Sequence, residues 1–213
     1  MSVDDEVSTP DRPGLRRTAR LEAFSDGVFA IAITLLVLDL AVPVTKLSEQ
    51  NLLDAIVDEW PGYLGYVVSF STVGAVWLGH NAITDYLHRA DVTLLRINLL
   101  LLFFVSFLPF PTRLLSEYVR TDQAERVAVT FYGLTLLITG ALLYLLWRYA
   151  LHAQLVRPDA GDEELTLLTH RLTPGLGAYG VLIVVGLFRP VAAVIGYFVI
   201  ALFFLLPVRI RRR

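Results

Sequence analysis

The most constraining feature of this sequence is an apolar segment, Phe24–Val42, that carries a carboxylate near each end, Asp26 and Asp39. Its 19 residues would rise about 28 Å as a helix, close to the roughly 30 Å of a bilayer hydrocarbon core. The segment can therefore cross a membrane. Ionisable groups are costly inside a bilayer and mark functional sites there. The segment predicts a membrane protein whose first helix takes part in its activity.

The composition of the whole chain agrees with a membrane location. Of its 213 residues, 55% are hydrophobic, and the mean hydropathy is +0.61. Ordinary soluble domains have roughly 45–50% apolar residues. The net charge of −2 offers no basic surface for nucleic acid, so no nucleic-acid partner is expected. The absence of cysteine excludes disulfides, thiolate metal sites and cysteine nucleophiles.

Hydropathy predicts an all-α integral membrane protein with six transmembrane helices and no re-entrant filter loop. The expected helices are Phe24–Val42, Trp60–Asn81, Val92–Leu108, Val127–Tyr149, Leu172–Phe188 and Pro190–Pro207. We expect Pro109 and Pro111 to stop the third helix. Pro174 and nearby glycines weaken the fifth helix.

All six helices are expected to form one domain, residues 20–208, between two polar ends. Residues 1–19 read as a disordered arm, and their acidic residues argue against a signal peptide. Residues 209–213 form a basic tail. Lys and Arg are more numerous on the side that holds both ends, so the positive-inside rule places both termini in the cytoplasm. An even number of crossings requires the same arrangement.

The first helix has two distinct faces when successive residues are placed about 100° apart. Ile31, Leu35 and Leu38 form an apolar stripe, with Thr34 beside it. Asp26 points almost opposite, and we expect it to be buried against neighbouring helices. Two interpretations of the stripe stay open: it lines a pore, or it faces lipid or packs in the core, as Ile and Leu do in any membrane helix.

If the stripe lines a pore, stacked rings of Ile31, Leu35 and Leu38 would make apolar constrictions that gate by dewetting. Thr34 would add a layer of hydroxyl oxygens. Asp39, at the outer end of the helix, would concentrate cations at the pore mouth.

Polar residues on the second and third helices are candidate partners for a buried Asp26, which needs hydrogen-bond donors. Trp77 and His80 are three residues apart and share a helix face. Asn98 carries an amide that seeks a partner on another helix. Structural alternatives remain: Asp26 with Ser25 would cap the helix start, and His80 would be a hydrogen-bonded structural histidine.

No catalytic motif of the common hydrolase, metalloprotease or nucleotide-binding kinds occurs in the sequence. The four histidines have no metal-ligand spacing. We therefore expect no enzyme, no cofactor and no bound metal other than a permeant ion.

One motif resembles a known family. The spacing Arg20-Xaa-Xaa-Xaa-Phe24-Ser25-Asp26, followed by an apolar helix, is similar to the signature of bacterial members of the lysosomal potassium-channel family known as transmembrane protein 175. The six-helix layout extends the resemblance over residues 20–208, together with three polar residues on the second and third helices: Trp77, His80 and Asn98.

The resemblance implies a homotetrameric, potassium-selective cation channel of the bacterial plasma membrane, with potassium ions and the lipid bilayer as partners. The first helix would line the pore, with the narrowest point at Ile31 and further apolar layers at Leu35 and Leu38. Thr34 would match a hydroxyl that some relatives use. The motif residues would bind the polar partners, hold the pore helix in place and take part in gating: Arg20, Phe24, Ser25 and Asp26 with Trp77, His80 and Asn98.

Two other functions stay open. A proton- or cation-coupled secondary transporter would use Asp26 and His80 as coupling groups. Transporters bind their substrates at discontinuous helices, whereas we expect the first helix to run unbroken from Phe24 to Val42. A non-conducting scaffold or an intramembrane enzyme would need a sealed first helix.

Overall fold

The computed structural model describes residues 18–40, 51–118 and 124–206. Its regular elements are helices, and the described chain adds one isolated β-bridge, Leu87 to Val156. In chain order the elements are α1 (Ala19–Leu35), the 3₁₀ helix η1 (Leu36–Asp39), α3 (Leu52–Asp58), α4 (Trp60–Thr84), α5 (Val92–Phe107), α6 (Pro109–Tyr118), α7 (Ala124–His152), α8 (Asp162–Phe188) and α9 (Pro190–Leu205).

Five segments of the described chain are long and apolar enough to cross a membrane: Ala19–Asp39, Trp60–Thr84, Val92–Tyr118, Ala124–His152 and Asp162–Phe188. The prediction of an all-α membrane protein is confirmed. The sixth expected helix, α9, has 16 residues and rises only about 24 Å, short of a typical hydrocarbon core. The sixth crossing therefore stays a prediction.

The first and third expected helices differ from the structure at their ends. α1 starts at Ala19 and continues without a break into η1, which ends at Asp39, so the first helix starts five residues before the expected Phe24 and ends before the expected Val42. Pro109 does not stop the third span, because it occupies the first position of α6, where a missing N–H costs nothing. Leu108 keeps helical angles between α5 and α6.

The second, fourth and fifth helices are longer than hydropathy predicts. α8 begins at Asp162, ten residues before the expected start, and accommodates Pro174 in its interior. Hydropathy did not detect this longer start because the first turn of α8 is charged, although acidic residues are favourable at a helix N-terminus. Residues 1–17 of the expected arm and the tail 209–213 lie outside the described residues.

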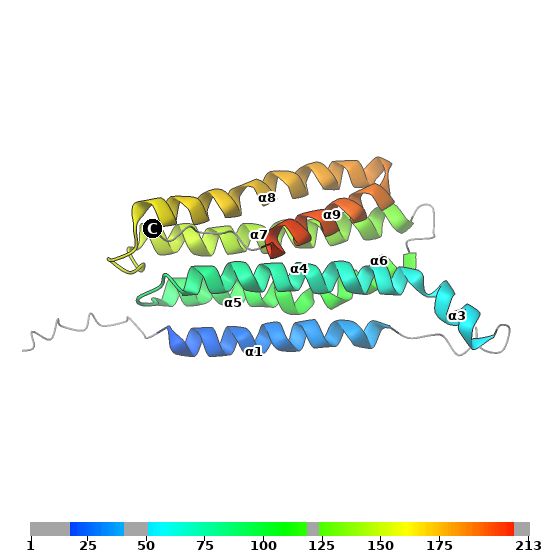
Figure 1. Cartoon of the computed structure of the whole chain (residues 1–213), viewed down its shortest axis with the longest axis horizontal. Coiled ribbons are helices and arrows are strands. Elements are labelled where there is room, and N and C mark those ends of the chain that lie inside the picture. Colours follow the sequence, from blue (N-terminus) through cyan, green and yellow to red (C-terminus); the bar gives the residue numbers. More distant parts are fainter. Residues whose placement is uncertain (1–17, 41–50, 119–123, 207–213) are drawn as a thin grey trace, which may run out of the picture.

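The helices stack in layers, with α1 at one edge, α4 and α5 beside it, and α7, α8 and α9 on the far side (Figure 1). α1 packs on α5 and α4 through residues spaced three or four apart. These buried residues are Leu21, Ser25, Phe29 and Ala32, continued in η1 by Leu36. Most of the remaining circumference of α1 faces outward at that edge.

Hydrogen bonds between helices fix the rotation of the central helix α4. The hydroxyl oxygen of Ser69 lies 2.6 Å from the Thr112 hydroxyl of α6 and 3.0 Å from the Tyr132 hydroxyl of α7. In an apolar bundle such bonds hold helices in register, because hydrocarbon offers no competing partner. The same rotation points the later residues Trp77 and His80 of α4 toward α1.

Candidate pore helix and its polar anchor

A buried chain of side-chain hydrogen bonds ties α1 to α5 and α4. The Asn98 amide nitrogen on α5 donates to the Ser25 hydroxyl on α1 over 3.0 Å. The Asn98 amide oxygen lies 2.8 Å from the Nε2 of His80 on α4. Because that oxygen accepts, Nε2 must carry the hydrogen and donate. All three side chains are buried, so the chain of bonds anchors α1 within the bundle.

The remaining nitrogen of His80, Nδ1, is buried and bonds to no described residue. The Phe29 ring, one turn after Ser25 on α1, packs against the imidazole with ring centroids 5.5 Å apart. Sequence reasoning missed Phe29, although its spacing of four residues from Ser25 places both on one helix face. The anchor is therefore part polar and part aromatic.

A second link between α1 and α4 lies at the protein surface. Trp77 donates from its indole nitrogen to a carboxylate oxygen of Asp26 over 2.9 Å. Asp26 itself is exposed in the protomer, so the expectation that it would be buried against neighbouring helices is wrong. Ser25 takes the buried position instead, because adjacent residues of a helix point about 100° apart.

Arg20 and Phe24 do not join this network among the described residues. Both side chains are exposed, and no hydrogen bond or ion pair of the described chain links Arg20 to Asp26. Phe24 instead borders the groove between α1 and α5. Their place in an anchoring network therefore rests on the resemblance alone.

The apolar stripe of α1 faces away from the protomer core. Ile31, Leu35 and Leu38 are 61%, 41% and 72% exposed. Thr34 is also exposed, and its hydroxyl donates to the Ile31 carbonyl over 2.9 Å, which leaves its oxygen free to accept. Asp39 is half-buried in η1, at the far end of the stripe. Packing in the protomer core is excluded, whereas a lipid-facing or a pore-facing role remains for the stripe.

Part of the stripe borders an open apolar groove of about 340 Å³ between α1 and α5. Ile31 and Leu35 form one wall, and Leu99 and Phe103 form the other. Sequence reasoning missed the α5 wall, although Leu99 and Phe103 are four residues apart on one helix face.

The comparisons with known proteins concern this same region. A family model described as "Endosomal/lysosomal potassium channel TMEM175" matches residues 20–109, which include the anchor and the stripe. A Streptomyces collinus protein named as a potassium channel is 39% identical over 176 residues, 81% of this chain and 83% of its own length. The chain belongs to the TMEM175 family. The resemblance drawn from the motif at residues 20–26 is thereby confirmed.

This TMEM175-family chain is also similar to a solved structure and to an animal protein. A crystal structure described as a lysosomal potassium-selective channel TMEM175 homolog from Chamaesiphon minutus matches with a TM-score of 0.80 and 37% identity. The match covers 88% of this chain and 96% of that one. A Gallus gallus relative, named as an endosomal/lysosomal proton channel, is 34% identical over 139 residues, 62% of this chain and 28% of its own length. The family is thus described by ion conduction rather than by catalysis.

Proposed function

We propose that this chain is one subunit of a homotetrameric potassium channel of the bacterial plasma membrane, with α1 of each copy around a central pore. The observation that carries the proposal is the outward apolar stripe on an anchored α1 at the edge of the fold. Membership of a family whose bacterial relatives are named potassium channels supplies the ion. The channel domain would span residues 20–208, with both termini cytoplasmic.

Exposed polar groups on α1 favour a pore over a lipid-facing surface. Asp26 and Thr34 are exposed in the protomer, on the part of α1 that the bundle leaves uncovered. A carboxylate facing hydrocarbon is costly, so the uncovered surface of α1 around these polar groups should meet water or another protein chain. A ring of subunits that places the α1 helices around its centre supplies water in the pore and protein contacts between the copies. A neighbouring copy would also cover the groove between α1 and α5.

The spacing of the stripe suits a narrow apolar passage. Ile31 and Leu35 would form rings about 6 Å apart along the axis, and Leu38, which lies in the 3₁₀ helix η1, would follow about 6 Å further on. Apolar rings disfavour a hydrated ion and admit most readily the cation that sheds its water most easily, which favours potassium over sodium. Thr34 oxygens would lie within this stack, and Asp39 would attract cations at its outer end.

An Ile31→Asn substitution tests this assignment. We expect it to hydrate the narrowest ring and weaken the preference for potassium over sodium. The measurement is the reversal potential in planar bilayers with potassium on one side and sodium on the other. The matched control is Val181→Asn on α8, because Val181 is as exposed as Ile31, 63% against 61%, but lies outside α1. An unchanged reversal potential for Ile31→Asn would refute Ile31 as the selectivity constriction.

A proton-coupled or proton-conducting role is the second candidate. It is favoured by the buried Nδ1 of His80, which has no partner among the described residues, and by the name of the avian relative. Recording first in potassium, and then with potassium replaced by an impermeant organic cation under a pH gradient, separates the two functions. A unitary current that is present in potassium and disappears on its replacement supports the channel. A saturable flux that follows the pH gradient, and that falls in Asp26→Asn, supports the transporter.

A further inference from the structure

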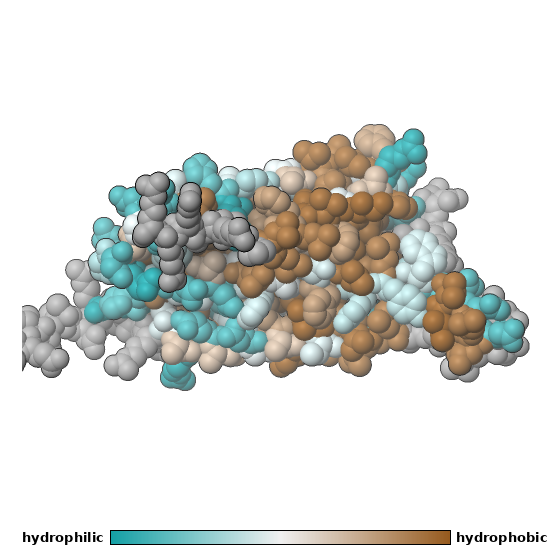
Figure 2. Space-filling model, in the orientation of Figure 1, coloured by the Kyte–Doolittle hydropathy of each residue, from teal (hydrophilic) through white to brown (hydrophobic). Residues whose placement is uncertain are grey.

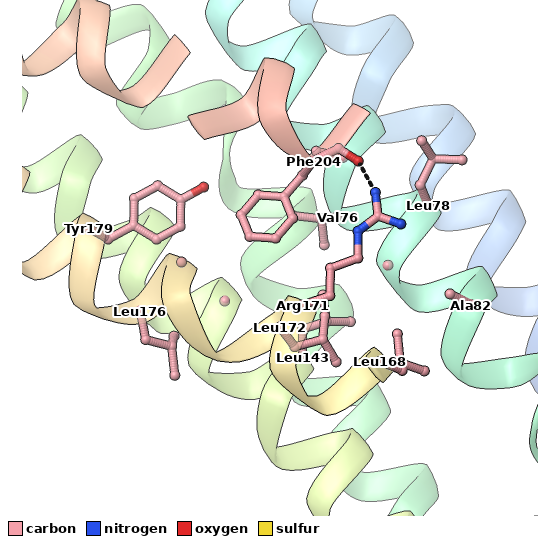
Figure 3. A pocket seen from close by; sticks show the side chains of 14 residues that line it. Val76, Leu78, Ala82, Leu143, Leu168, Arg171, Leu172, Leu176, Tyr179 and Phe204 are labelled. Atoms are coloured by element: carbon pink, nitrogen blue, oxygen red, sulfur yellow. Dashed lines mark hydrogen bonds between the residues drawn. The ribbon is translucent and has the colours of Figure 1, made fainter. Parts of the chain in front are cut away.

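A second apolar pocket lies between α4, α7, α8 and α9 (Figure 3). Its volume is about 70 Å³. Arg171 on α8 is the one charged residue among those that line it. The rest of the wall is mainly aliphatic and aromatic, and includes Val76, Ala82, Leu143, Leu172 and Phe204. Neither the anchor nor the stripe of α1 contributes to this pocket.

The pocket lies beside the end of α9, which is too short to accompany α8 along its whole length. α8 rises about 40 Å and α9 about 24 Å, so α9 stops beside the middle part of α8 (Figure 1). Arg171 reaches across to the end of α9. Its Nη2 donates to the carbonyl oxygens of Phe204 and Leu206 over 2.8 and 3.0 Å.

The position of Arg171 matches the boundary between hydrocarbon and lipid headgroups. Arg171 precedes Phe188 by 17 residues, or about 26 Å, which approaches the roughly 30 Å thickness of the hydrocarbon core. Hydrophobic side chains cover the face around α9, and hydrophilic ones gather toward the end where α8 begins (Figure 2). An arginine at this depth can hold its charge at the polar boundary while its stem stays among apolar groups.

The guanidinium retains donors for an anion. It has five N–H groups, and within the described chain its bonds come from Nη2 alone, so Nε and Nη1 have no partner there. Nε and Nη1 point their hydrogens to different sides of the guanidinium, so each can donate a single charge-assisted hydrogen bond to a phosphate oxygen. The pocket behind them is apolar, and apolar cavities stay empty of water but accept apolar ligands.

We propose that this pocket holds part of an acyl chain of an anionic phospholipid, with the lipid phosphate bound to Arg171. The apolar wall, the charged group at its edge and the depth of that group each match one part of such a lipid. A zwitterionic lipid fits less well, since its own ammonium group competes for the phosphate. The site is separate from conduction and stands whether or not the proposed channel function is correct.

Lipid binding can be tested on the purified full-length protein by native mass spectrometry and by thermal unfolding. We expect dioleoyl-phosphatidylglycerol to be retained at one molecule per protomer and to raise the melting temperature more than dioleoyl-phosphatidylcholine does. Arg171→Gln should weaken phosphatidylglycerol binding at least about tenfold, equivalent to about 1.4 kcal/mol. Ala82→Phe should fill the pocket and weaken binding while leaving the bonds from Arg171 to α9 intact.

Arg148→Gln is the matched control, because Arg148 is an exposed arginine of α7 outside the pocket. The Arg148→Gln variant should bind phosphatidylglycerol as strongly as the wild type does. Equal retention of the two lipids by the wild-type protein would overturn the proposal. Undiminished phosphatidylglycerol binding in both pocket variants would also overturn it. If Arg171→Gln fails to fold because α9 loses its cap, Ala82→Phe and the wild-type lipid preference decide.

Discussion

Replacing Asn98 by leucine should release α1 from the bundle. The substitution keeps a similar side-chain volume but removes the amide that donates to Ser25 and accepts from His80. Hydrogen bonds between membrane helices contribute about 0.6 kcal/mol on average and up to about 1.7 kcal/mol. Two lost bonds therefore predict a loss of roughly 1–3 kcal/mol. The upper part of this range is expected, because Ser25 and His80 are almost fully buried and would be left without partners.

Two measurements together test this prediction. Equilibrium unfolding in mixed micelles of rising dodecyl sulfate fraction gives the change in unfolding free energy. Hydrogen exchange of the α1 amides reports local release, and exchange should be roughly 5–150-fold faster for a loss of this size. Asn98→Leu should also lower the unfolding free energy by less in a Ser25→Ala background, where one of the two hydrogen bonds is already absent.

Ser106→Ala is the control on the same helix pair. Its hydroxyl donates to the Phe103 carbonyl within α5 over 2.9 Å and bonds to no other helix of the described chain, so the unfolding free energy should change by less than about 0.5 kcal/mol. The anchoring role would be refuted if Asn98→Leu also changed the unfolding free energy by less than about 0.5 kcal/mol and left exchange in α1 unaltered.

Three further outcomes follow from local geometry. Gly133→Ala should lower the unfolding free energy by about 1–3 kcal/mol in the same micelle assay, because a Cβ there would lie 2.8 Å from the ring carbon Cζ of Tyr197. Asp91→Ala should lower the unfolding free energy by about 0.5–2 kcal/mol in thermal unfolding, since this N-cap carboxylate accepts a hydrogen bond from a first-turn amide of α5 over 2.7 Å. Asp91→Asn should retain most of the stability. Burial and the nearby Glu164 carboxylate raise the pKa of Tyr86, and Glu164→Gln should lower that pKa in ultraviolet titration against a Tyr86→Phe reference.

The direction of the Tyr86 effect on stability follows from the raised pKa. Folding favours the neutral phenol, so the contribution is fully present below the pKa of the unfolded chain. It is lost as pH rises through the higher pKa of the folded protein. Stability that increased across this alkaline range in the wild type, relative to Tyr86→Phe, would contradict the assigned cause.

The anchor of α1 separates what residue spacing can predict from what it cannot. A motif of charged and polar residues ahead of an apolar helix was enough to identify the family, and Trp77, His80 and Asn98 were predicted as partners of that motif. The structure brings these three residues to α1. It shows, however, that Asn98 bonds Ser25 and His80 bonds Asn98, while Asp26 accepts from Trp77 at the surface. A helical wheel fixes the angles between residues but does not say which face meets the bundle.

The positions of the helix ends likewise include some that the sequence predicts and some that it does not. Hydropathy located the apolar middle of each long helix, because a bilayer core demands about 20 apolar residues whatever the tertiary fold. It placed the start of α8 ten residues late and ended the third span at Leu108, whereas α6 continues this span from Pro109, since charged first turns and a proline at a helix start leave hydropathy uninformative. Both errors concern backbone hydrogen bonding, which composition does not record.

The sequence by itself determined the membrane class and the apolar stripe on α1, because these depend on composition and on fixed helical periodicity. Its motif at residues 20–26 carried the resemblance to the family. Tertiary structure alone decided that α1 lies at the edge of the bundle, that Ser25 rather than Asp26 is buried, and that Leu99 and Phe103 border the stripe. It also decided that α9 ends beside Arg171. These features depend on how helices distant in the chain rotate and slide against one another. That arrangement is set by the sum of many packing and hydrogen-bond contacts, none of which is visible in a single segment.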